Sequence, residues 1–233
     1  MKQFILLAAL NFCLILTSVG QTKDAAVWEN IYLQKHLTPR WVIHFNHEGR
    51  ITKNVSQFHY GYGDFGLTYK FNKNFHATVD YVFVAKYLEK SGLSNRHQTY
   101  VALTYKKKIR PFVFSYRQML QEQVQDIYSS ELGKLPAYFS RSKLTIKWEL
   151  NRFTPYVASE LYVRLSEAYA KDPEHRTQPY GPHANRMRYF AGCFYELNKM
   201  NLVEAYYLIE QHFNENNPAT NYVIGIGYAH EFY

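Results

Sequence analysis

Apolar and polar residues alternate one by one along most of this chain. In the stretch 40–50, Trp41, Ile43 and Phe45 share one parity, while His44, Asn46 and other polar residues hold the opposite one. The same period of two recurs in residues 64–71, 75–83, 100–105, 112–117, 143–149, 157–164, 186–196, 203–210 and 222–228. Successive side chains of a β-strand point to opposite faces, so the pattern predicts an all-β chain whose strands have one apolar and one polar face.

The connections between these strands alternate between short and long. Short ones fall near residues 38–39, 72–74, 107–110, 151–152 and 198–200, and long ones at roughly 51–57, 86–96, 121–138, 166–184 and 211–220. Short turns on one rim and long loops on the other are typical of an antiparallel outer-membrane barrel. The segments, of about 9 to 13 residues, also match the length that a tilted strand needs to cross a bilayer.

The number of strands is expected to be 10 to 12. Eleven candidate segments can be drawn, but an ordinary outer-membrane barrel has an even number, with both chain ends on the periplasmic side. The segment Trp28–Leu37 is the odd one. Two interpretations remain: it is a wall strand with an unrecognised partner, or it lies inside the lumen.

The first 20 residues have the layout of a cleaved secretory signal. One lysine, Lys2, precedes an apolar run over residues 4–16, and the small residues Ser18 and Gly20 follow. The run is shorter than the ~20 residues that a membrane-spanning helix needs, which argues against an uncleaved anchor. We therefore expect a signal peptide at residues 1–20 and a single barrel domain at 21–233, with Cys193 as the only cysteine of the mature chain.

The composition agrees with a two-faced barrel wall. Aromatic residues make up 18% of the chain, yet its mean hydropathy is only −0.40, as expected when apolar residues are interleaved with polar ones. The formal net charge is +8, or +7 without Lys2 of the signal. This excess suits anionic lipid, and because no nucleic-acid-binding motif is present we expect outer-membrane lipid, not nucleic acid, as the partner.

The polar parity is expected to line the barrel interior. Acids and bases are about equally frequent on it, whereas a soluble barrel would turn this face to water. The charged residues predicted to line the lumen are Glu48, Arg50, Asp80, Arg117, Arg141, Glu160, Arg164, Arg188 and Glu204. Two interpretations remain, because these charges either fill a narrow interior as a structural scaffold or form a narrow channel selective for an anionic solute.

Several short motifs resemble a known family. They are Trp28 at the opening of the first strand, Arg50 at the end of the first hairpin, "GLTYKFNKNF" with Tyr69, "YRQ" with Arg117, "PYVASE" with Glu160, and the late strand "RMRYFAGCFYELNK". With these the chain resembles the exported barrel family catalogued as domain of unknown function 2490, found in Bacteroidota and other Gram-negative bacteria. The resemblance implies an outer-membrane location and no established activity.

The last residues, "YAHEFY", resemble the C-terminal aromatic signal that the barrel-insertion machinery reads. The apolar parity of the last strand runs through Tyr228 to Phe232, which places the terminal Tyr233 on the other parity. The resemblance therefore predicts that this machinery is a partner, and it leaves open whether Phe232 or Tyr233 takes the terminal position.

Two chemical hypotheses compete with this structural interpretation. A metal site at His44, His47 and Glu48 is disfavoured because on a strand His47 points away from the other two. A lipid-modifying enzyme of the acyl hydrolase or transferase type would need a histidine beside a serine or an acid. The histidines considered are His59, His97, His175, His183, His212 and His230, and the serines are Ser56, Ser94 and Ser142. No motif or spacing singles out a pair, so no catalytic, cofactor-binding or metal-binding residue is assigned.

Overall fold

A computed structural model describes residues 22–88, 92–125, 137–166, 181–214 and 218–232; the predicted signal peptide lies outside these ranges. The strands are β1 (Thr22–His36), β2 (Trp41–Thr52), β3 (Gln57–Lys70), β4 (Phe75–Leu88), β5 (Gly92–Ile109), β6 (Phe112–Gln125), β7 (Ala137–Trp148), β8 (Phe153–Arg164), β9 (His183–Asn198), β10 (Asn201–His212) and β11 (Ala219–Phe232). Among the described residues no helix is long and apolar enough to span a membrane.

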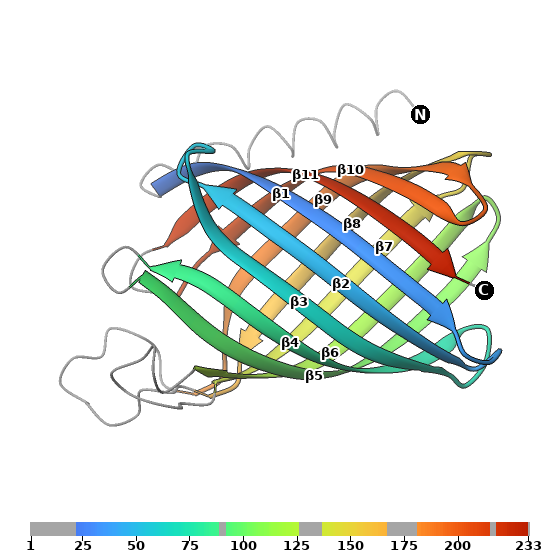
Figure 1. Cartoon of the computed structure of the whole chain (residues 1–233), viewed down its shortest axis with the longest axis horizontal. Coiled ribbons are helices and arrows are strands. Elements are labelled where there is room, and N and C mark those ends of the chain that lie inside the picture. The colour runs from blue at the N-terminus through green and yellow to red at the C-terminus, as the bar shows by residue number, and fades with distance from the viewer. Residues whose placement is uncertain (1–21, 89–91, 126–136, 167–180, 215–217, 233) are drawn as a thin grey trace.

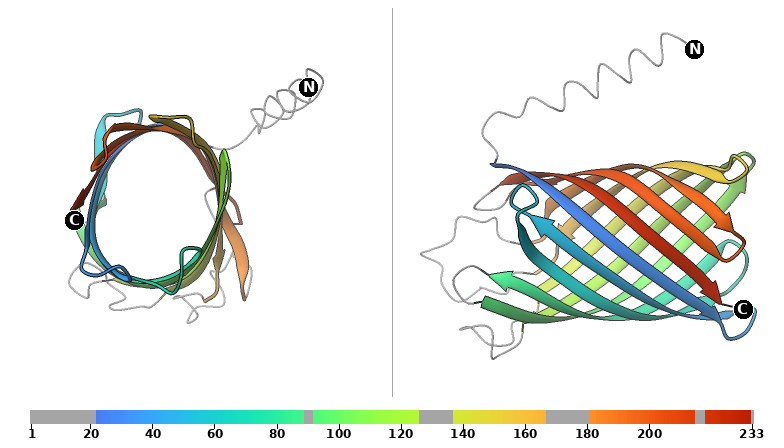
Figure 2. Two further views of the ribbon diagram at one scale, coloured as in Figure 1. Left: turned by 90° about the vertical axis from the view of Figure 1, so that its right-hand side faces the viewer. Right: turned by 45° about the horizontal axis from the view of Figure 1, so that its top comes forward.

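The eleven strands close into one barrel in which each strand lies beside its neighbours in the sequence (Figure 1). Viewed along its axis, the wall forms an unbroken oval ring (Figure 2). All pairings between consecutive strands are antiparallel. The predicted all-β barrel of 10 to 12 strands is therefore confirmed.

The first strand resolves the odd count. Residues 28–36 of the uncertain segment lie in β1, which is part of the wall and pairs with β2 on one side. On the other side β1 pairs with β11 in parallel, with Val27 opposite Ile224. The odd number of strands puts the start of β1 on the rim opposite the end of β11, unlike an even-numbered barrel, in which they share a rim (Figure 1).

The strands extend further into the predicted long loops than the sequence indicates. Residues 86–96 were expected to form a loop, but β4 continues to Leu88 and β5 resumes at Gly92. The predicted loop at 51–57 shortens to residues 53–56 in the same way. Strand ends that project beyond an apolar belt carry polar side chains, so composition does not distinguish them from loops.

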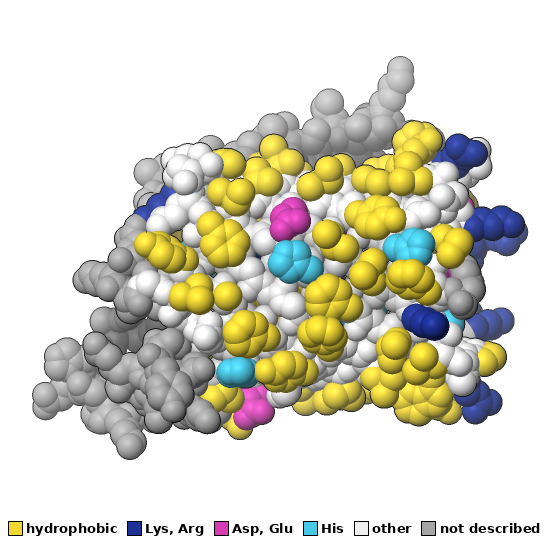
Figure 3. Space-filling model, in the orientation of Figure 1, with side chains coloured by type: hydrophobic (Ala, Val, Ile, Leu, Met, Phe, Trp, Pro, Cys, Tyr) yellow, Lys and Arg dark blue, Asp and Glu magenta, His cyan; other side chains and the backbone are white. Residues whose placement is uncertain are grey.

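The two faces of the wall differ as the alternation predicts. On β4, Val79 is 57% exposed on the outer face, while Asp80 is 2% and Val84 is 0% exposed on the inner face. On β11, Ile224 is 65% exposed and its neighbour Val223 is fully buried. On the side of the barrel shown in Figure 3, apolar side chains are spread over the outer surface of the wall. The apolar face is outside and the charged face is inside.

Candidate functional site: the charged barrel interior

An ion network runs along the inner face of the wall from β6 to β10. We call it the interior ion network, and it consists of Arg117, Arg141, Glu160, Arg188 and Glu210. Arg117 and Arg141 each donate a hydrogen bond of 2.9 Å to Oε1 of Glu160. Arg188 lies 3.5 Å from Oε2 of Glu160 and donates through Nε to Glu210. Five strands thus meet through two carboxylates.

Glu210 has further partners on β9, β10 and β11. Arg186 lies 3.7 Å from its Oε2, and His212 Nε2 lies 3.0 Å from its Oε1. The amide of Asn221, on β11, donates to the same Oε1 at 3.2 Å. Glu210 was not among the predicted lumen residues, although its place on the polar parity was the signal that would have included it.

Both carboxylates are removed from water. Glu160 is 1% exposed and Glu210 is 4% exposed. A buried carboxylate loses its hydration and needs charged or hydrogen-bonding partners in its place. Here arginine guanidinium groups are those partners. Removing one partner of such a pair leaves an uncompensated charge and destabilises a protein by about 3 to 5 kcal/mol. The network therefore links the inner faces of five adjacent strands.

A second group of contacts lies where β1 meets β2. The Arg50 guanidinium forms an ion pair with Glu48 and stacks 3.7 Å from the ring centroid of Trp28. The Arg188 guanidinium lies 5.3 Å from the same ring. Trp28, only 4% exposed, thus connects this pair to the interior ion network.

The remaining predicted lumen residues lie apart from the network. Glu204 accepts a hydrogen bond from the Tyr156 hydroxyl. Arg164 donates through Nε to the Ser166 carbonyl at 3.3 Å, close to the long-loop rim. Asp80 belongs to a separate cluster on β2, β3 and β4. The nine residues therefore divide into several groups of contacts along the interior.

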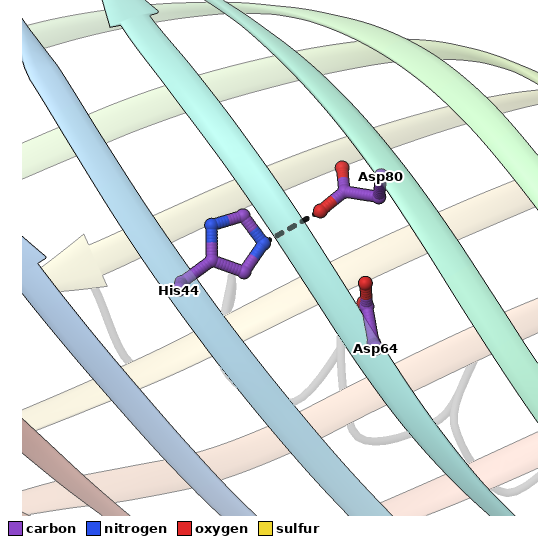
Figure 4. Close-up of side chains that lie close together, drawn as sticks. All are labelled: His44, Asp64 and Asp80. Atoms are coloured by element: carbon purple, nitrogen blue, oxygen red, sulfur yellow. Dashed lines mark ion pairs between the residues drawn. The ribbon is translucent and has the colours of Figure 1, made fainter.

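That separate cluster consists of His44, Asp64 and Asp80 (Figure 4). The cross-strand register places Gly66 directly between His44 on β2 and Asp80 on β4. Because position 66 has no side chain, the imidazole and the carboxylate meet above it, with Nε2 and Oδ1 2.6 Å apart. A Cβ at this position would overlap both groups.

Asp64 completes the cluster from the same face of β3. Its Oδ2 accepts a 2.7 Å hydrogen bond from the Tyr100 hydroxyl on β5. One ligand atom from each of the three residues lies within 4.8 Å of the others. Sequence reasoning missed the cluster because two of its members come from other strands than His44, and their convergence depends on register.

The trio considered from the sequence does not converge. His47 points outward, where its Nε2 lies 3.4 Å from the Glu29 carboxylate and its side chain is 44% exposed. Glu48 points inward and pairs with Arg50. His44 therefore takes different partners from the two residues that follow it closely in the sequence.

The described residues give the enzyme alternative no serine–histidine pair. The Tyr81 hydroxyl and His97 Nδ1 are hydrogen-bonded at 2.6 Å, and His230 Nδ1 lies 2.7 Å from Oδ1 of Asn201. The Ser56 hydroxyl donates to a backbone carbonyl, and that of Ser142 donates to Gln118. His175 lies outside the described residues.

The other described candidates lie in different settings. His183 Nδ1 is 3.0 Å from the Gly181 carbonyl, and His212 contacts Glu210. His59 is half-buried in β3, and Ser94 is fully buried in β5. None of these contacts joins a serine hydroxyl to an imidazole.

Comparison with known proteins gives a family and a distant structural likeness. No curated protein matches the chain. Among solved structures, a chain described as "NanC porin structure in rhombohedral crystal form" matches with 11% identity and a TM-score of 0.47, covering 85% of this chain and 95% of that one. The family model described as "Protein of unknown function (DUF2490)" matches residues 25–222. Because that match spans most of the sequence, the chain belongs to the DUF2490 family.

Proposed function

We propose that the protein is exported by a cleaved signal at residues 1–20 and resides in the outer membrane of a Gram-negative bacterium. The apolar outer face supports this, because an exposed belt of this kind is stable only against lipid. Aromatic pairs lie near the short-turn rim, as in an interfacial girdle: Trp41 against Tyr69 at 4.7 Å and Phe112 against Trp148 at 6.1 Å.

The same rim carries a concentration of positive charge. Lysine and arginine side chains gather at the right-hand end of the barrel in Figure 3. Those in or beside the short turns include Arg40, Lys70, Lys73, Lys107, Lys108, Arg110, Arg152 and Lys199. We propose that they contact lipid phosphates, and that Phe232, exposed at the end of β11, is read by the barrel-insertion machinery. Tyr233 lies outside the described residues.

Within the membrane, the barrel acts as a structural scaffold whose lumen is closed by the interior ion network. The observation that carries this proposal is Glu160, which is 1% exposed at the point where arginines from three neighbouring strands converge. In an open aqueous pore such a carboxylate would be hydrated. Its burial therefore supports a lumen that side chains fill at this level.

A narrow anion channel is the second candidate function. The Arg117 side chain is 33% exposed although it is bonded to Glu160, so part of the interior has room for water or a small solute. If this room continues through the barrel, the surplus of arginine over carboxylate in the network would favour anions.

Localisation is tested by separating cell membranes. The full chain should be found with the outer-membrane fraction, resist extraction by carbonate, and migrate on a gel differently before and after heating, as a folded barrel does. Folded protein free in periplasmic fluid without detergent would overturn the proposal.

Lumen closure is tested in planar bilayers. Purified wild-type protein should give no steady conductance, whereas Glu160→Ala should conduct anions, because the freed arginines repel one another. Glu122→Ala, which removes an acid bonded to Tyr138 near the long-loop rim, is the control and should stay silent. Steady anion conductance by the wild type would instead establish the channel.

A further inference from the structure

We propose that the His44–Asp64–Asp80 cluster is a binding site for one divalent transition-metal ion of the Zn²⁺ type. The three side chains come from adjacent strands and point toward one another inside the barrel (Figure 4). Their ligand atoms lie within 4.8 Å of one another. Bonds of about 2.0 to 2.2 Å to one ion hold tetrahedral ligand atoms about 3.3 to 3.6 Å apart, so binding would open the 2.6 Å contact between His44 Nε2 and Asp80 Oδ1 and draw in any wider spacing.

The negative charge of the cluster favours a bound cation. Asp64 is 5% exposed and Asp80 is 2% exposed, and among the described residues neither forms an ion pair with a lysine or arginine. Even with a protonated His44, two ionised carboxylates leave the cluster negative. Buried charge of this kind is normally compensated by a partner or a bound metal. Glu160 and Glu210, by contrast, have their arginines.

The cluster also has buried carboxylate oxygens that are free to bind a ligand. Among the described residues, Asp80 Oδ2 and Asp64 Oδ1 are buried without a hydrogen-bond partner. The other oxygen of Asp64 is held by the Tyr100 hydroxyl, which orients the carboxylate. At metal sites a ligand carboxylate is commonly held through one oxygen by a hydrogen bond from a second-shell residue, which leaves the other oxygen for the metal.

The donor set selects the class of ion. One imidazole nitrogen with two carboxylate oxygens suits Zn²⁺ and its first-row neighbours, whereas Ca²⁺ and Mg²⁺ prefer oxygen ligands alone. Three protein ligands also leave a coordination position for water or a small ligand from the lumen. Gly66 is the residue that makes the site sterically possible, because any side chain there would occupy the space in which the ligands meet.

Metal content tests the proposal directly. The full chain, stripped with a chelator in denaturant, is refolded in detergent with Zn²⁺ present, passed over a desalting column and measured by elemental analysis. We expect one equivalent of Zn²⁺ per chain. The variants Asp64→Asn, Asp80→Asn and His44→Gln should each raise the Kd at least about tenfold. Glu204→Gln, which alters a different interior carboxylate, should bind as the wild type does.

Two further measurements separate loss of binding from loss of folding. Heat-dependent gel mobility establishes that each variant is a folded barrel, and only folded variants are compared. Co²⁺ in place of Zn²⁺ should give visible absorption bands in the wild type that disappear in Asp80→Asn. A folded wild type that retains no Zn²⁺ after refolding, or folded Asp64→Asn and Asp80→Asn variants that retain it fully, would overturn the assignment.

Discussion

The Trp28 indole of β1 lies 3.7 Å beneath the Arg50 guanidinium of β2, and this contact anchors the first strand to the interior. Trp28 belongs to a small buried apolar cluster with Ala26 of the same strand and with Leu208 and Val223 of β10 and β11. The strand that closes the barrel is thus fixed by packing and a cation–π contact as well as by backbone pairing.

Replacing Trp28 should therefore loosen the closure. We expect Trp28→Ala to lower the free energy of unfolding by about 3 kcal/mol or more, from the cavity that the ring leaves. Urea titration followed by the fluorescence of Trp41 and Trp148 measures it. The outward-facing Trp41→Phe, read by the other two tryptophans, should change stability much less; an equal loss in both would contradict the role assigned to Trp28.

Gly66 provides a sharper test of the inner cluster. Gly66→Ala should push the His44 and Asp80 side chains apart, because the added Cβ would overlap both, and it should lower the urea midpoint and abolish Zn²⁺ retention. Gly63→Ala, on the same strand, is the matched control, since its Cβ would meet only Phe45 at an ordinary 3.6 Å. Equal behaviour of the two variants would argue against a special role for position 66.

The parallel pairing of β1 with β11 can be tested by crosslinking. Val27 and Ile224 are in register across this seam, so their Cβ atoms lie on one face at neighbouring-strand distance. A Val27→Cys, Ile224→Cys protein lacking Cys193 should be joined by a short bismaleimide, which shifts the mobility of the denatured chain. The pair Val27→Cys, Val157→Cys, on non-adjacent strands, should not react; failure of the first pair alone to crosslink would refute the seam.

His76 should give stability a measurable pH dependence. It is the second residue of β4, beside the short turn at 71–74, where burial together with Lys106 and Lys70 lowers its pKa below the usual 6.5. In the window between the two pKa values the unfolded chain binds more protons, so stability should decrease as the pH falls through it. An NMR titration of His76 should give a value below 6.5, and Lys70→Gln should raise it. A value at or above 6.5 in the wild type would be inconsistent with this environment.

The architecture was largely predictable because alternation is a local property. Within a few residues, the alternation identifies the apolar and the polar face of a strand, as Val79 and Asp80 illustrate. This is enough to predict apolar groups outside and charged groups inside. Strand ends were harder, since residues such as Asn95 and Arg96 are polar in a rim strand just as in a loop.

Closure and the inner cluster were beyond local inference because both depend on contacts between distant segments. The residues of β1 give no local signal that this strand pairs with β11. The meeting of His44 with Asp80 requires Gly66 in register between them, and a slip of one residue would move these side chains to the opposite face. The sequence argument about His47 considered one strand at a time, and for that reason it missed the cluster.

The parallel seam has a consequence for engineering this barrel. Since β1 starts on one rim and β11 ends on the other, a short peptide cannot tie the two ends together, and circular permutants of the usual kind are ruled out. Tags fused just before β1 and just after β11 would instead report on opposite sides of whatever boundary the wall spans.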